Sequence, residues 1–203
     1  RAAEMLADGK VGGAFDISRE PTKVRERYGA HSWGQQALLA RRLVEVGVPY
    51  TLVNFNLNQN TGQDWDNHTN IFSVMKNKLL PPTDRAISAL LDDLEERGLL
   101  DTTLVAVYGE FGRTPKINDK GGRDHWAGSA PLLLYGGGLQ MGQVVGSSTK
   151  DGGEPASHRV TIPNLYATIM ETILDVGTIR STPGIPEEVS KVIHGASPIR
   201  QLM

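Results

Sequence analysis

Short apolar segments alternate with amphipathic helical segments along this chain, and the alternation limits the folds open to it. Three short apolar segments, residues 48–55, 103–108 and 130–135, are expected to be strands, and the first is rich in β-branched and aromatic residues. Between the first two, Thr83 stands before apolar residues at helical spacing and Gly98 follows them. Such alternation is typical of a parallel sheet covered by helices. We therefore predict an α/β fold with a mostly parallel sheet and helices on both faces.

Two further helices are expected from the same spacing rule. Ser32 stands before an apolar face that includes Leu38 and Leu43, and Gly47 supplies a stop. Thr161 stands before a similar face near the C-terminal end. We see no internal repeat, low-complexity tract or linker, so residues 1–203 are predicted to form a single domain.

The composition argues against several classes of protein. The 203 residues contain no apolar run near 18 residues, so a membrane-spanning helix is not expected. Lys and Arg number 21 against 23 Asp and Glu, and a net charge of −2 does not favour binding to nucleic acid or an anionic membrane. The absence of cysteine excludes disulfides, thiolate metal ligands and a cysteine nucleophile.

The beginning of the chain also carries information. It opens at Arg1 without an initiator methionine and continues into an amphipathic helical stretch at residues 3–7. We expect a fragment or a processed product, in which an export signal and further active-site residues would lie upstream.

Polar loops at the ends of the apolar segments carry side chains that suit metal binding. The candidate ligands are Asp64, Asp66, His68, Glu110, Asp124 and His125, and Arg113 follows Glu110 in the same loop. Loops at one edge of an α/β sheet converge, and mixed carboxylate and imidazole ligands suit Zn²⁺, Mn²⁺ or Fe, whereas all-oxygen sets suit Mg²⁺ or Ca²⁺. Asp66 and His68 would point the same way in an extended segment. The sequence therefore predicts a divalent metal site at the sheet edge.

Each of these features also has a simpler interpretation. Asp66 and His68 would be unremarkable in a polar surface turn, and the Asn67 sequon matters only in a secreted eukaryotic chain. Glu110 and Arg113 are close enough in sequence for a local ion pair. The residue types alone leave these alternatives open.

The neighbouring residues are open to two interpretations in the same way. Asp124 can orient the imidazole of His125 instead of binding metal, and the glycines at 136–138 form a turn more readily than a phosphate cradle. Trp65 and Trp126 flank the candidate ligands, and packing is the simpler role for both.

Four motifs stand out: WDNH at 65–68, GEFGRTP at 109–115, GGRDHW at 121–126 and APLLLYGGG at 130–138. Together they closely resemble an uncharacterised bacterial family of the alkaline phosphatase and sulfatase superfamily. The resemblance extends to segments 38–50, 142–148, 159–169 and 198–203, so it covers nearly the whole chain.

The resemblance implies an alkaline-phosphatase-like fold, of which this chain would be the C-terminal half. It implies a metal-dependent hydrolase of phosphate or sulfate esters, acting on a small-molecule or saccharide ester. Proteins of that family often carry a twin-arginine export signal, so a periplasmic or extracellular location is expected if such a signal lies upstream.

The resemblance also assigns roles to individual residues. Asp66, His68 and His125 would form the first metal site, and Glu110 would serve a second one, where the superfamily usually has an Asp-His pair. Asp124 is counted among the candidate metal ligands, with Zn²⁺ or Mn²⁺ favoured over Ca²⁺ or Mg²⁺.

The expected catalytic residue in this chain is Arg113, which would stabilise an anionic ester oxygen. The superfamily's Ser, Thr or formylglycine nucleophile and its early Asp ligand have no matching motif here and are expected upstream. The alternative hypothesis is a non-catalytic domain that binds a metal or another ligand without a nucleophile.

Overall fold

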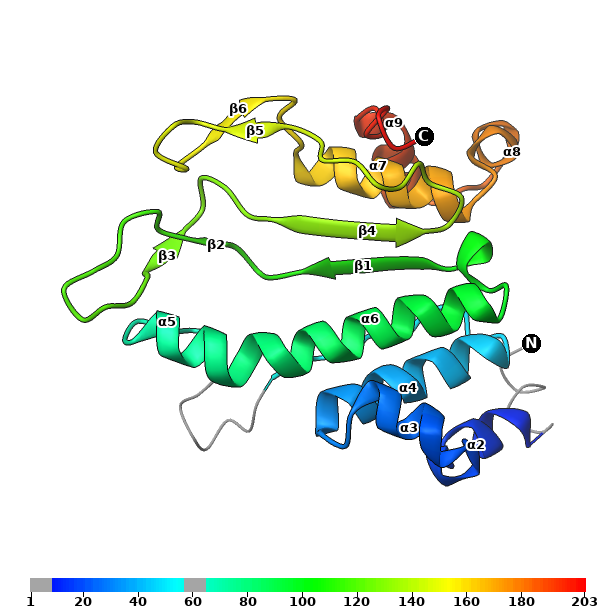
Figure 1. Ribbon diagram of the computed structural model, residues 1–203. Helices are drawn as coiled ribbons and strands as arrows, with labels where there is room; N and C mark the ends of the chain where they lie inside the picture. Colours follow the sequence, from blue (N-terminus) through cyan, green and yellow to red (C-terminus); the bar gives the residue numbers. More distant parts are fainter. Residues whose placement is uncertain (1–8, 57–64) are drawn as a thin grey trace. The chain divides into compact units, whose positions relative to one another are not determined.

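The computed structural model describes residues 9–56 and 65–203, which divide into two compact units (Figure 1). Unit 1 comprises Arg1–Leu99 and Lys116–Asp124, and unit 2 comprises Leu100–Pro115 and His125–Met203. The single domain over residues 1–203 stays a prediction. The helical stretch expected at residues 3–7 and the candidate ligand Asp64 lie outside the described residues.

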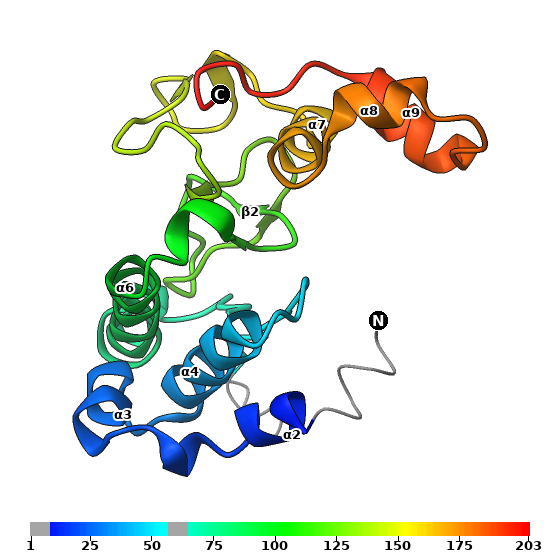
Figure 2. The same cartoon turned by 90° about the vertical axis from the view of Figure 1, so that its right-hand side faces the viewer.

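In the described part of unit 1, the regular structure is helical. Its elements are α2 (Lys10–Ala14), the 3-10 turn η1 (Ile17–Arg19), α3 (Thr22–Tyr28), α4 (Ser32–Glu45), α5 (Ile71–Val74), the π-helical turn η2 (Met75–Leu79) and α6 (Leu80–Glu96). The helices α3, α4 and α6 pack on one another, and Figure 2 shows α4 beside α6. The core between them contains Tyr28, Ala37, Leu38, Ala86 and Ala89.

The two long helices expected from sequence are confirmed, with different first residues. At α4 the capping group is the Nδ1 atom of His31, which accepts a hydrogen bond from Gly34 N at 3.1 Å, and not Ser32. The helix α6 begins before the two prolines, and Thr83 lies inside it with its Oγ1 donating to Leu79 O at 2.7 Å. Prolines are tolerated in a first helical turn because its N–H groups have no intrahelical partner.

A buried guanidinium connects the helices of unit 1. The side chain of Arg41 is 0% exposed, and its Nε lies 2.8 Å from Asp93 Oδ2 while its NH2 lies 2.9 Å from Glu20 Oε2. Tyr28 also donates to Asp93, at 2.9 Å. Burial raises the pKa of Asp93, but hydrogen bonds from Arg97 and Tyr28, together with the charges of Arg41 and Arg97, lower that pKa more, so it lies below its ordinary value of 3.8.

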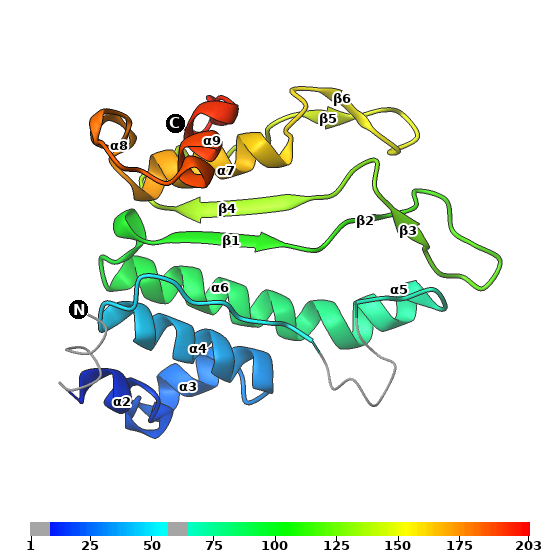
Figure 3. The same ribbon diagram turned by 180° about the vertical axis from the view of Figure 1, so that it is seen from behind.

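Unit 2 combines short strands with three helices. Its elements are η3 (Leu100–Thr102), β1 (Leu104–Tyr108), β2 (Gly112–Arg113), β3 (His125–Trp126), β4 (Leu132–Gly136), β5 (Ser147–Ser148), β6 (Pro155–Ser157), α7 (Ile162–Ile173), α8 (Val176–Ser181) and α9 (Glu187–Gly195). The helix α7 begins at the expected cap, where Thr161 and Asn164 bond each other reciprocally. The helices α7 and α9 pack against each other, and Figure 3 shows them side by side.

The predicted mixture of helices and strands is confirmed, but the mostly parallel sheet is wrong for the described residues. They form three two-stranded sheets, β1 with β4, β2 with β3 and β5 with β6, and all three are antiparallel. In the longest, Leu104 pairs with Gly136 and Tyr108 with Leu132. The connection from β1 to β4 contains β2 and β3 and no helix, whereas a parallel pair needs a crossover connection, usually helical.

The strand expected at residues 48–55 is also wrong. The structure assigns no strand there, and exposed residues alternate with half-buried ones along the segment. Tyr50 is 74% exposed and Leu52 is 72% exposed, so the segment is not covered on both faces. Among the described residues, no helix is long and apolar enough to cross a membrane.

Candidate metal centre

Aromatic packing holds the start of the loop that carries the first candidate ligands. The ring of Trp33, 1% exposed, stacks on Phe55 at 5.4 Å and on Trp65 at 5.8 Å between centroids. The Nε1 atom of Trp65 donates to Phe55 O at 2.5 Å. Trp65 therefore has the packing role that the sequence allowed. Because Trp65 directly precedes Asp66, this packing fixes the backbone that leads into Asp66.

Backbone hydrogen bonds then join this loop to a second segment of unit 1. The N–H groups of Arg123, Asn70 and Ile71 donate to the carbonyls of Asn67, Lys120 and Gly121 at 3.1, 3.2 and 2.9 Å, respectively. A Cβ atom at Gly122 would overlap the carbonyl group of His68. Only glycine permits this close approach, which carries Asp124 toward the loop of His68.

Asp66 and His68 project to the same side of their loop. Asp66 Oδ1 lies 3.0 Å from His68 Nε2, and the two side chains are 46% and 42% exposed. An ion at this position would therefore be reached from solvent.

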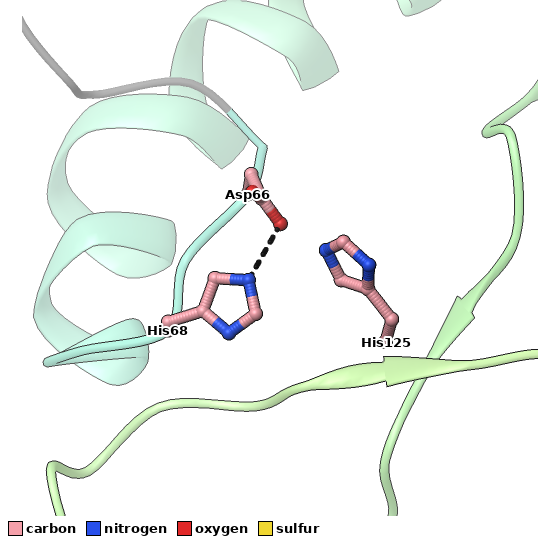
Figure 4. Close-up of side chains that lie close together, drawn as sticks. All are labelled: Asp66, His68 and His125. Atoms are coloured by element: carbon pink, nitrogen blue, oxygen red, sulfur yellow. Dashed lines mark ion pairs between the residues drawn. The ribbon is translucent and has the colours of Figure 1, made fainter.

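His125 supplies the third potential ligand. Ligand atoms of Asp66, His68 and His125 all lie within 4.8 Å of one another, and Figure 4 shows the three side chains turned toward a common point. This is the only such group of three in the part of the chain that the structure describes.

Asp124 lies on the other side of the His68 ring. Its Oδ1 is 2.7 Å from His68 Nδ1, the nitrogen that does not face Asp66. The hydrogen bond to the Asp124 carboxylate raises the pKa of His68 above its ordinary value of 6.5. The sequence allowed Asp124 to orient His125, and the structure places the Asp124 carboxylate against His68.

Asn118 is a residue of this site that the sequence analysis missed. Its Nδ2 donates to Asp124 Oδ1 and to His68 O, both at 3.1 Å. Its Oδ1 accepts from the backbone N–H groups of Lys120 and Gly122, at 3.0 and 2.9 Å. The sequence does contain a signal for this role. Asn118 lies shortly before Gly121 and Gly122, and Asn side chains in turns commonly form hydrogen bonds with the backbone of the residues that follow them.

The other candidate residues lie in unit 2, after β1. Arg113 pairs with His125 in the β2–β3 ladder, and its guanidinium carbon lies 5.3 Å from the ring centroid of Phe111. The Phe111 ring in turn lies 4.6 Å from the ring of His125. Glu110 Oε1 is 3.5 Å from Arg113 NH2, and the Glu110 side chain is 67% exposed. Arg113 is thus a neighbour of His125, and the assignment of Glu110 to a second metal stays a prediction.

Comparison with known protein families identifies the family of this chain. The profile of a family described as "Protein of unknown function (DUF1501)" matches residues 2–183. The chain belongs to this family. Comparisons with curated proteins and with solved structures gave no match.

The donor set in this DUF1501 member consists of side-chain types that bind divalent metals. One carboxylate oxygen and two imidazole nitrogens are the ligand types that Zn²⁺ and Mn²⁺ accept, whereas Ca²⁺ and Mg²⁺ prefer oxygen alone. Two ligands at about 2.1 Å from one ion lie at most about 4.2 Å apart. The pair formed by Asp66 and His68 meets that limit at 3.0 Å, whereas the three ligand atoms together lie within 4.8 Å of one another.

Proposed function

We propose that this chain carries the metal-binding part of a hydrolase that acts on phosphate or sulfate esters. The single observation that carries the proposal is the group formed by Asp66, His68 and His125. The type of ester follows from the resemblance of the WDNH, GEFGRTP and GGRDHW motifs to the alkaline phosphatase and sulfatase superfamily. The metal is Zn²⁺ or Mn²⁺ in this proposal, because two of the three donors are imidazoles.

The roles of the chain's own residues follow from their chemistry. Asp66, His68 and His125 would hold the ion, which when bound supplies a Lewis acid for an ester oxygen. Arg113 would bind an anionic oxygen of the ester, since a guanidinium presents paired N–H donors to such groups. Arg113 pairs with His125 across the β2–β3 ladder, and this adjacency supports its role.

The nucleophile is expected upstream of Arg1 in this proposal. A single ion without a second one lacks the paired clamp that stabilises both the attacking and the leaving oxygen of an in-line displacement. We therefore expect the 203-residue chain to bind a divalent metal and to hydrolyse simple monoesters poorly, and a version extended upstream to be active.

The test compares both versions of the protein. Metal content and Zn²⁺ affinity are measured first, and turnover of aryl phosphate and aryl sulfate is then assayed with Zn²⁺, Mn²⁺, Mg²⁺ and Ca²⁺. An Asp66→Ala variant of each version is the control. Strong turnover by the short chain that Asp66→Ala abolishes would place the nucleophile within these residues, and absence of metal binding by both versions would overturn the proposal.

A second candidate function is a domain that binds metal without catalysis. One observation favours it: within residues 9–56 and 65–203, no second group of three potential ligands accompanies the first. The two candidates differ in the extended protein, which binds metal in either case but hydrolyses esters only if the first is correct.

A further inference from the structure

The two ring nitrogens of His68 have different carboxylate partners. Nε2 faces Asp66 Oδ1 at 3.0 Å, and Nδ1 faces Asp124 Oδ1 at 2.7 Å. The bonding directions of the two nitrogens diverge across the ring, so a carboxylate in line with Nδ1 does not reach an ion held at Nε2. The two carboxylates therefore have different tasks at this histidine.

We infer that Asp124 is a positioning residue for metal binding by His68, and that Asn118 in turn holds Asp124. The inference rests on the proposed metal site and deepens it. All of the residues that carry it belong to unit 1.

The physical basis is control of the imidazole tautomer. A metal-binding histidine donates its second N–H to a carboxylate, a carbonyl or water, and this bond fixes both the ring orientation and the nitrogen that is free to bind. With its proton on Nδ1 and directed at Asp124, His68 keeps the Nε2 lone pair on the side of Asp66. The charge of Asp124 also increases the basicity of the ring toward an ion.

Asn118 gives this arrangement its rigidity. Its two amide hydrogens go to Asp124 Oδ1 and to the carbonyl of His68, so it joins the carboxylate to the backbone of the residue that the carboxylate orients. Its amide oxygen accepts from Lys120 and Gly122, which fixes the turn before Asp124. The side-chain amide thus uses both donors and both acceptor positions.

The experiment measures Zn²⁺ affinity by competition with a chromophoric chelator in the 203-residue chain. We expect Asp124→Ala to bind Zn²⁺ about 10- to 100-fold more weakly than the unchanged chain, the range typical of losing an outer hydrogen-bond partner. Asp124→Asn should recover part of the loss, because its amide oxygen still accepts from Nδ1. Asn118→Ala should weaken binding less than Asp124→Ala does. The matched control is Asp119→Ala, which removes an exposed carboxylate from the same loop.

A spectroscopic measurement on the unchanged chain needs no variant to fold. Nitrogen-15 NMR of the Zn²⁺-loaded protein should show His68 with a protonated Nδ1 and a metal-bound Nε2. Binding of the ion through Nδ1 would overturn the inference, and so would an Asp124→Ala affinity within twofold of that of the unchanged chain. Failure of the unchanged chain to bind Zn²⁺ would instead overturn the proposed function on which the inference rests.

Discussion

Asp66 Oδ1 lies 3.0 Å from His68 Nε2, within a single loop and only two residues along the chain. Replacing His68 by glutamine removes the imidazole nitrogen from this pair. We expect His68→Gln to weaken Zn²⁺ binding at least about 100-fold, more than the loss of an outer partner, because a direct ligand is lost. Isothermal titration calorimetry checks this, with the exposed His194→Gln as the matched control. Equal affinities of the two variants would show that His68 is not a ligand.

Gly122→Ala should separate the two segments that form the site. The new Cβ would overlap the backbone carbonyl of His68, which cannot move aside like a flexible side chain. We expect Zn²⁺ affinity to fall about 10-fold or more as Asp124 moves away from His68. Gly12→Ala, where a Cβ meets nothing within 4 Å, should leave the affinity unchanged. The same chelator competition measures both, and unchanged binding by Gly122→Ala would contradict the observed packing.

Arg41→Met should destabilise unit 1 strongly. The substitution leaves the carboxylates of Glu20 and Asp93, both nearly buried, without their shared guanidinium. Breaking a buried ion pair by removing one partner costs about 3 kcal/mol or more in the free energy of unfolding. By contrast, Arg19→Met removes an exposed pair with Asp16 and should cost less than about 1 kcal/mol. Urea unfolding followed by tryptophan fluorescence compares the two, and similar losses would argue against the buried network.

The same network predicts how stability depends on pH. Burial raises the pKa of Glu20, but hydrogen bonds and charge from Arg41 and Arg42 lower that pKa below its ordinary value of 4.5, and the pKa of Asp93 lies below 3.8. A depressed folded-state pKa adds stability that is complete above the unfolded-state pKa and is lost as pH falls through the folded value. We therefore expect the free energy of unfolding to fall below about pH 4.5 for this reason. Urea titrations from pH 7 to pH 3 check this, and the fall should be shallower in Arg41→Met.

Local signals in the sequence determined much of the helical structure. Thr161 and Asn164 lie three residues apart and form reciprocal capping hydrogen bonds at the start of α7. The helix predicted to follow Thr161 is therefore confirmed. The helical spacing places Leu38 on an inward helix face, and Leu38 is buried in the core of unit 1. These properties depend on residues close together in the chain.

Tertiary structure decided the pairing of the strands. An apolar run such as Leu104–Tyr108 looks the same whether its neighbour runs parallel or antiparallel, and only the partner Leu132–Gly136 sets the direction. Residues 48–55 have a similar composition, yet the structure assigns them no strand. Strand pairing is a contact between distant segments, so composition alone does not determine it.

The candidate metal site divides in the same way. The sequence predicted Asp66, His68 and His125 as candidate ligands, because mixed carboxylate and imidazole side chains suit a divalent ion. Only the folded loops decided that Asp66 and Asp124 face opposite nitrogens of His68, and that Asn118 joins the second carboxylate to the loop. Asp124 is 56 residues from His68 along the chain. The backbone hydrogen bonds between their two segments, and the absence of a side chain at Gly122, determine the side from which Asp124 approaches the His68 ring.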